Sequence, residues 1–401
     1  MDRLSIFLYS ILRMSNDALN INQIFSPLQI GYITEIIEPI NAGANIDWVM
    51  NLATENPKLN GIPIERHGIV QGVLTREALK KLAGSAWSKF WQKDLDAYVI
   101  PTKEVLDATS NINKILEDVL KQESYETIWY IIQYRRNHLG IVSLKKIIEY
   151  TNELRTRDLI RAGEIQQHLL QKSETNDKRF SLCLFNHMAN EIGGDFYRVY
   201  RPDKDHILVG CFDVAGKNIS GALTTMALGA CFSSFELFRF VGAAEKVTNR
   251  INVLIKDVNP LGIFVAAVLF YIDFTVKLIR IHNCGFSPVL IFVPQSDNKI
   301  SYKISNPTLP PLGIEKEYDF SDCQIIPITK GLRLCAYSDG LIDMMNIYGD
   351  RYGEDRASKL IKDLYSIPPS GIHKAITNKI NNWIGTASLA DDITLMDMRF
   401  K

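Results

Sequence analysis

Two stretches of the N-terminal half share one pattern of hydrophobic and polar positions. In GIPIERHGIVQGVLTREALKKL, residues 61–82, the pattern predicts two short strands joined by a tight turn and followed by a helix. TIWYIIQYRRNHLGIVSLKKIIEYT, residues 127–151, repeats this order around a basic turn. Thr75 and Ser143 directly precede the two helices, and their hydroxyl groups are predicted to cap the first helical turns.

A further helix is predicted ahead of each stretch, over residues 44–55 and 111–122. Two copies of the same order of elements indicate a duplicated module. In this pattern residues 28–150 resemble a tandem pair of CBS domains. The resemblance implies a regulatory sensor module that forms a homodimer and takes an adenine nucleotide as its ligand.

The polar residues that hold the nucleotide in many CBS pairs are only partly present. Such pairs place an Asp three residues after a Ser or Thr, whereas here Thr75 is followed by Ala78 and Ser143 by Lys146. A dimerisation scaffold without a ligand is therefore an equally weighted alternative.

Charged residues dominate TNELRTRDLIRAGEIQQHLLQK, residues 151–172, but apolar residues recur at helical spacing. The pattern predicts a helix within a linker of residues 151–173, either a solvated tether or a signalling helix that pairs with its twin in a dimer. Gly163 is its weak point, where the helix could bend, because glycine costs about 1 kcal/mol relative to alanine inside a helix. The apolar face predicted for this helix consists of Leu154, Leu159, Ile165 and Leu169.

Beyond residue 178 the chain alternates between apolar strand-like runs and helical patterns separated by tight turns. The predicted strands are 206–214, 263–274, 277–284, 288–293, 331–340 and 393–400, and the predicted helices are 221–240, 354–365 and 371–384.

Composition narrows the class of protein. The 401 residues are 46% hydrophobic and 22% charged, which is typical of a globular protein of two or three domains. Lys plus Arg and Asp plus Glu both number 45, and this balance argues against a nucleic-acid partner. The 6 cysteines form no CxxC pair, which favours a reducing cytoplasm over a disulfide framework or a zinc site.

The first residues, MDRLSIFLYSILRM, contain an apolar run far shorter than the roughly 20 residues of a membrane span. They also lack the basic leader and the small-residue cleavage site of a signal peptide. Residues 1–27 are therefore predicted to form an amphipathic helical segment that docks on the protein or on a second copy, and no membrane association is expected.

Four acidic positions recur in one context, each beside a small residue or another acid at the end of a predicted strand. Asp195 follows two glycines, Asp213 and Asp339 end strands, and Asp391 with Asp392 precedes the last strand. Clustered carboxylates repel each other, and divalent cations are the usual counter-charge. Oxygen ligands without a His/Cys cluster indicate two Mg²⁺ or Mn²⁺ ions about 4 Å apart, able to polarise a phosphoryl group and activate water.

Other phosphoryl chemistries fit the sequence less well. A cysteine-dependent phosphatase needs Arg six residues after the Cys, but Leu290 follows Cys284 at that distance. GCFDVAGKN differs from a P-loop in its glycine spacing and in having Asn218 after the lysine. His187 and His282 lie within strand-like runs and are interpreted as structural.

The flanks of these acids, taken in order, resemble the SpoIIE-type branch of the PPM family of metal-dependent protein serine/threonine phosphatases. The motifs are EIGGDFYRVY, GCFDVAGKNISGAL, HNCGFSPVLIF, PPLGI, YSDGLIDMMNIYGDRYG and ADDITLM, and the resemblance covers residues 174–401. GEIQQHLL in the preceding helix also resembles the helix ahead of this domain in bacterial stress-response phosphatases.

The resemblance implies an α+β fold, in which two antiparallel sheets form a sandwich flanked by helices with metals at one end. Asp213 would bridge two metal ions, and the backbone carbonyl of Val214 would add a ligand. Asp195, Asp339 and Asp391 would complete the cluster, and the glycines before Asp195 would allow close approach. Hydroxide on the metals would attack phosphorus in line. The implied substrate is a phosphoserine or phosphothreonine protein, by analogy an anti-sigma-factor antagonist.

Three departures from the family pattern bear on substrate fit and rate. Arg198 stands where an acid is common, the loop after Asp213 carries Ala215 and Asn218, and Phe286 replaces the usual histidine of the middle motif. Because all four acids are present, an active enzyme is expected. The alternative is a catalytically weak, phosphatase-like binding module controlled by the CBS pair.

Overall fold

The computed structural model describes residues 23–57, 59–84, 95–121, 128–170, 174–216, 219–233, 243–259, 262–294 and 300–401. The chain divides into two compact units, Met1–Arg157 and Asp158–Lys401. The helical segment predicted for the start of the chain lies outside the described residues up to residue 22. In the described part of the chain, no helix combines the length and the apolar character needed to cross a membrane.

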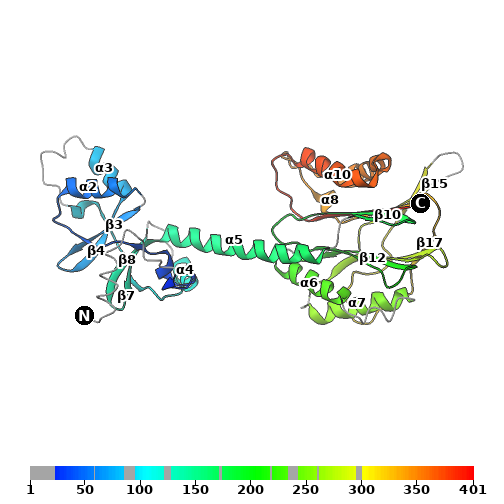
Figure 1. The fold of residues 1–401 in the computed structure, drawn as a ribbon, viewed down its shortest axis with the longest axis horizontal. Helices are drawn as coiled ribbons and strands as arrows, with labels where there is room; N and C mark the ends of the chain where they lie inside the picture. Colours follow the sequence, from blue (N-terminus) through cyan, green and yellow to red (C-terminus); the bar gives the residue numbers. More distant parts are fainter. Residues whose placement is uncertain are drawn as a thin grey trace. The chain divides into compact units, whose positions relative to one another are not determined.

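The first unit contains the predicted duplication (Figure 1). The first copy is β2 (Ile40–Asn41), α2 (Ile46–Glu55), β3 (Gly61–Arg66), β4 (Ile69–Thr75) and α3 (Arg76–Gly84). The second copy is β6 (Val105–Asp107), α4 (Ile112–Leu120), β7 (Trp129–Tyr134), β8 (Asn137–Ser143) and α5 (Leu144–Leu169). The sheets, completed by β1 (Glu35–Ile36) and β5 (Val99–Pro101), run β2-β3-β4-β5 and β1-β8-β7-β6.

Local chemistry explains why both copies fold alike. Thr75 Oγ1 accepts a hydrogen bond from the Ala78 N–H at 3.3 Å, and Ser143 Oγ accepts one from the Lys146 N–H at 3.2 Å, so both predicted caps are confirmed. In each copy a parallel pair, β2·β3 or β6·β7, is followed by an antiparallel hairpin with a bulge. The two copies therefore share their strand topology as well as their apolar pattern.

The second unit is a sandwich of two antiparallel sheets. One sheet has the order β16 (Ile300–Ser305), β15 (Val289–Pro294), β18 (Arg333–Tyr337), β19 (Ile393–Phe400), β10 (Phe180–His187), β9 (Glu174–Asn176). The other has the order β11 (Asp195–Tyr200), β12 (His206–Val214), β13 (Val265–Asp273), β14 (Leu278–Cys284), β17 (Gln324–Pro327). The predicted fold of this half is confirmed.

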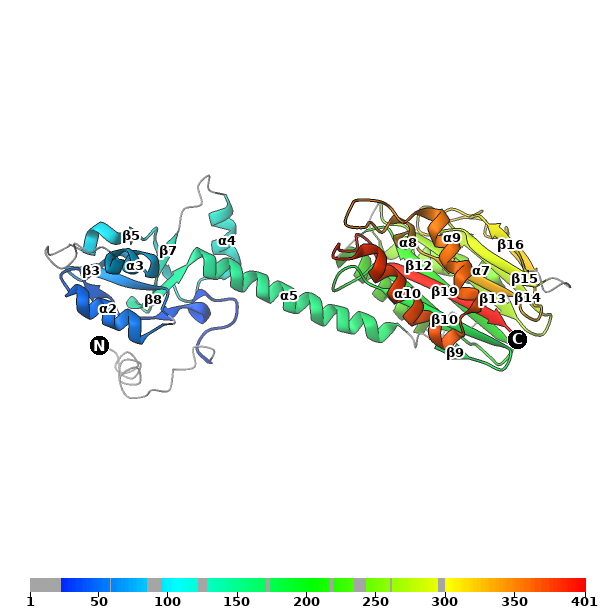
Figure 2. The same cartoon turned by 90° about the horizontal axis from the view of Figure 1, so that it is seen from above.

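Helices cover both outer faces of the sandwich, as Figures 1 and 2 show. The helices α6 (Ile219–Ser233) and α7 (Ala244–Val258) pack on the sheet of β12, and α8 (Gly340–Asp343), α9 (Gly353–Asp363) and α10 (Pro369–Ile384) pack on the sheet of β19. A third apolar core lies between the sheets. The alternation of side chains along strands such as β12 is what places one set in each core.

The predicted connecting helix differs from the structure in two ways. It is not a separate element, because α5 starts at Leu144 as the last helix of the duplicated module. The face that is buried within the single chain also differs from the predicted apolar face, because Ile165 is 56% exposed, whereas Gly163 and Gln166 are buried. The helix therefore buries a small and a polar residue, which a search for apolar spacing does not find.

A buried ion pair joins two neighbouring strands of the second unit to a covering helix. Arg333 of β18 and Asp397 of β19 are each 1% exposed and are paired through two guanidinium nitrogens. The Arg333 Nη1 group also donates to the Ile361 carbonyl of α9 at 2.9 Å. Arg399 donates from Nε to Asp397 Oδ1 at 2.8 Å.

We predict that Arg333→Met destabilises the second unit by about 3 kcal/mol, because a buried carboxylate loses its main partner. The measurement is urea unfolding of the full chain, followed by tryptophan fluorescence. Lys316→Ala is the control, since the Lys316–Asp257 pair is more than half exposed on both sides and should contribute little. Equal unfolding midpoints for the two variants would contradict the prediction.

Candidate active site

The predicted acidic residues meet at one end of the sandwich. Asp195 opens β11 and lies directly opposite Asp213 of β12 in the antiparallel register. Asp339 follows β18, and Asp391 with Asp392 precedes β19, the neighbour of β18 in the other sheet. Carboxylates from both sheets therefore lie at the same end of the sandwich.

A cavity of about 310 Å³ lies at this end. Four predicted site residues line it, namely Asp213, Val214, Asp339 and Asp391, and Asp392 and Gly194 line it as well. Asp195 does not line the cavity; it is 2% exposed and lies beneath it. The structure thus brings the predicted residues together, with Asp195 in a supporting layer.

Ser338 holds the buried Asp195 in place. Its hydroxyl donates to Asp195 Oδ2 at 2.9 Å and accepts from the Thr394 N–H at 2.8 Å. Ser338 directly precedes Asp339. The same short segment therefore holds the buried carboxylate of Asp195 and carries the cavity-lining carboxylate of Asp339.

Asp392, to which no separate role could be assigned from the sequence, organises the loop before β11. Its Oδ1 accepts from the Ala189 N–H at 2.7 Å, and its Oδ2 accepts from the N–H groups of Gly194 at 2.6 Å and Asp195 at 3.3 Å. The adjacent pair Asp391-Asp392 was the available signal, because two acids at one strand end can divide ligand and support roles.

The two glycines before Asp195 are required for close approach, but to different partners than expected. A Cβ on Gly193 would lie 2.4 Å from Asp392 Oδ2, and one on Gly194 would lie 3.2 Å from the Val214 carbonyl oxygen. Larger residues would therefore push the loop away from Asp392 and from the end of β12.

Burial and mutual repulsion dominate the electrostatics of the cluster. Burial, followed by the charges of Asp213 and Asp392, raises the pKa of Asp195 well above its usual range. Burial, followed by the charges of Asp339 and Asp391, raises the pKa of Asp213 to about 8. These carboxyl groups are therefore not all ionised at neutral pH without an added positive charge.

The donor chemistry fits a hard divalent cation, because every side chain at the cavity that can ligate offers oxygen. Among the residues that the structure describes, no three His, Cys, Asp or Glu side chains stand so that they could hold a metal ion together. Asp213 instead hydrogen-bonds with Asp339. Asp339 is exposed and Asp391 is half-buried.

Two of the departures from the family pattern have a structural explanation. Arg198 does not line the cavity, and its Nη1 donates to the Leu169 carbonyl at the C-terminal end of α5 at 2.8 Å, where a cation is favourable. Phe286 is 3% exposed and belongs to the core between the sheets. Asn218 lies outside the described residues.

His282 has a structural role, as interpreted from the sequence. It is 1% exposed, its Nδ1 lies 2.6 Å from Thr248 Oγ1 of α7, and burial lowers its pKa to about 4.

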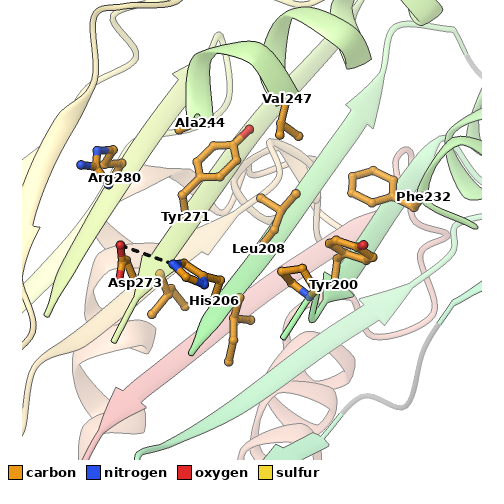
Figure 3. Close-up of a pocket in the computed structure, with 12 residues that line it drawn as sticks. Tyr200, His206, Leu208, Phe232, Ala244, Val247, Tyr271, Asp273 and Arg280 are labelled. Carbon is orange, nitrogen blue, oxygen red and sulfur yellow. Dashed lines mark ion pairs between the residues drawn. The ribbon is translucent and has the colours of Figure 1, made fainter. Parts of the chain in front are cut away.

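A small cavity of about 40 Å³ lies nearby, between this sheet and α7 (Figure 3). Leu208, Val247 and Tyr271 line it.

A comparison with protein families supports the interpretation of the acidic cavity as an active site. Residues 203–401 match the family model described as "Stage II sporulation protein E (SpoIIE)". This part of the chain is a SpoIIE-family PPM phosphatase domain. The match includes Asp213, Asp339 and Asp391, whereas Asp195 lies ahead of it.

One curated relative agrees with this assignment, and one solved structure shares the fold. Phosphoserine phosphatase RsbP of Bacillus subtilis (strain 168) is 25% identical over 189 residues, which are 47% of this chain and 45% of that protein. The chain thus spans less than half the length of this curated relative. The solved SiaA-PP2C domain of Pseudomonas aeruginosa has the same fold, with a TM-score of 0.51 and 18% identity over 63% of this chain and 99% of that domain.

The last turns of α5 pack against the loop that carries the two glycines. A Cβ on Gly163 would lie 2.0 Å from the Glu191 carbonyl oxygen. Glycine is therefore required for contact with the loop, which is a different reason from the bend predicted at this position.

We predict that Gly163→Ala lowers the thermal stability of the second unit, although alanine favours a helix by about 1 kcal/mol. The steric overlap with a backbone oxygen should outweigh that gain, because the loop must shift to accept the methyl group. The control is Ala162→Gly at the neighbouring exposed position, where only helix propensity acts. A higher midpoint for Gly163→Ala in calorimetry of the full chain would show that the contact is unimportant.

Proposed function

We propose that this chain is a metal-dependent protein serine/threonine phosphatase. The observation that carries the proposal is the convergence of Asp213, Val214, Asp339 and Asp391 on one cavity of a SpoIIE-family domain. The name of the relative RsbP as a phosphoserine phosphatase supports phosphoserine as a substrate group.

In this proposal the chain's own residues hold two Mn²⁺ or Mg²⁺ ions. Asp213 and the Val214 carbonyl would hold them from one sheet, and Asp339 and Asp391 would hold them from the other, all as oxygen ligands. Asp195 acts from beneath the cavity, in contact with Ser338. When bound, the ions would supply the charge that activates water and offsets the negative phosphoryl group.

The cavity is bordered by backbone and by small residues that leave room for a phosphorylated side chain. Ala215, Gly216, Ala266 and Gly285 line it beside the acids. A phosphoryl group at its mouth can approach the carboxylate cluster only when cations are present, because like charges repel. Cation binding and substrate binding are therefore coupled in this proposal.

We further propose that the N-terminal module regulates the phosphatase domain. Residues 28–150 would act as a tandem CBS-like sensor that forms a homodimer, with residues 151–173 as the linker and residues 174–401 as the catalytic domain. The repeated topology of the first unit supports this assignment. The substrate would be a phosphorylated regulatory protein of the anti-sigma-factor antagonist class. Sedimentation of the full chain tests the dimer, and a monomer at high concentration would contradict it.

We predict that Asp213→Asn and Asp339→Asn each reduce Mn²⁺-dependent hydrolysis of p-nitrophenyl phosphate by more than about 100-fold. Loss of outer-shell partners alone typically costs roughly 10–100-fold, and these residues would be ligands. Asp257→Asn, on the exposed surface of α7, is the matched control and should retain activity. A wild-type chain that releases no phosphate with Mn²⁺ would instead favour a phosphatase-like binding module.

A further inference from the structure

The side chain of Gln166 forms an unusual pair of hydrogen bonds with one residue of the site loop. Its Nε2 donates to the Gly193 carbonyl at 2.6 Å, and its Oε1 accepts from the Gly193 N–H at 3.0 Å. Gln166 is 2% exposed, so water does not compete for these groups. A single amide thus holds both polar backbone groups of Gly193, as a neighbouring strand would.

A second helix fixes this amide from the other side. Gln166 Nε2 also donates to Thr225 Oγ1 of α6 at 2.6 Å, and Thr225 in turn donates to the Ala222 carbonyl at 2.8 Å. Gly221 of the same helix approaches the loop after β12 so closely that a Cβ would lie 2.4 Å from the Gly216 carbonyl oxygen. The hydrogen bond to Thr225 therefore fixes the orientation of the Gln166 amide that contacts Gly193.

The position of Gly193 determines where the next residue of the loop lies. The N–H of Gly194 donates to Asp392 Oδ2, and the Gly194 carbonyl accepts from the Val214 N–H at 3.3 Å. Residues 188–194, all of which are described, form neither helix nor strand. Because no regular ladder supports this loop, external hydrogen bonds must hold it.

We propose that Gln166 is a positioning residue for the cation site. Through Gly193 it fixes the positions of Gly194, of the Asp392 carboxylate and of the Val214 end of β12. These positions in turn determine the affinity of the site for divalent cations. The inference rests on the proposed function, because it assumes that cations bind at this cavity. Gln166 belongs to α5, the helix that precedes the domain. It would act on the cation site without lining the cavity.

The test compares Gln166→Met with Gln167→Met in the full chain. Methionine keeps the length and apolar volume of glutamine but can form neither hydrogen bond to Gly193. Gln167 is the matched control, since it is the next residue of α5 and is exposed. Mn²⁺ binding is measured without substrate, by electron paramagnetic resonance of the free ion, beside thermal unfolding and p-nitrophenyl phosphate turnover across Mn²⁺ concentrations.

We predict that Gln166→Met weakens Mn²⁺ binding about tenfold, the effect expected from losing one to two buried hydrogen bonds. Turnover at saturating Mn²⁺ should stay within about threefold of wild type, because no ligand is removed. Gln167→Met should bind Mn²⁺ like wild type. Thr225→Val, which removes the acceptor for Nε2, should shift Mn²⁺ binding in the same direction by less.

Two results would overturn the inference. If Gln166→Met melts earlier but binds Mn²⁺ with unchanged affinity, the residue only supports packing. If Gln166→Met fails to fold and Thr225→Val binds Mn²⁺ like wild type, the link from α6 to the loop does not set affinity. A wild-type chain that neither binds Mn²⁺ nor releases phosphate removes the proposed function itself, which distinguishes the two failures.

Discussion

The contact on which the site depends is the carboxylate of Asp392 bound by the backbone N–H groups of Ala189, Gly194 and Asp195. Asp392 belongs to the approach to β19, and Asp195 opens β11, so this contact joins the two sheets at the end where the acids gather. Hydrogen bonds from N–H groups to a buried carboxylate are among the stronger ones in proteins. Without it, the two sheets would share an apolar core but no common site.

The sandwich brings together charges that would otherwise separate. The apolar cores on both faces of each sheet fix the strands, and the strands fix the acids at their ends. Burial, and after it the repulsion between neighbouring carboxylates, raises the pKa values of Asp195 and Asp213. In such an arrangement an added positive charge has a large stabilising effect.

Much of the fold could be predicted from apolar strand patterns and turn residues, as with β12 and the hairpin of β3 and β4. The convergence of Asp213 and Asp339 followed from strand ends meeting at one edge. By contrast, the edge strand β16 is largely exposed on both faces, so it leaves little apolar signal.

The supporting residues were harder to find, since their partners are distant in sequence. Gln166 contacts Gly193 and Thr225, and Ser338 contacts Asp195, through groups that have no periodic pattern. In the same way, the buried face of α5 is set by backbone contact at Gly163 rather than by apolar side chains.

The register of β11 against β12 places Asp195 opposite Asp213, and every pair from there to Tyr200 and Leu208 keeps step with it. Side chains alternate between faces along a strand, so a shift by one residue would exchange the two faces along the whole pair. Deletion or insertion of a single residue in this hairpin would therefore be far more damaging than most substitutions there. We expect length changes in this domain to be least damaging in loops away from the acid-bearing end.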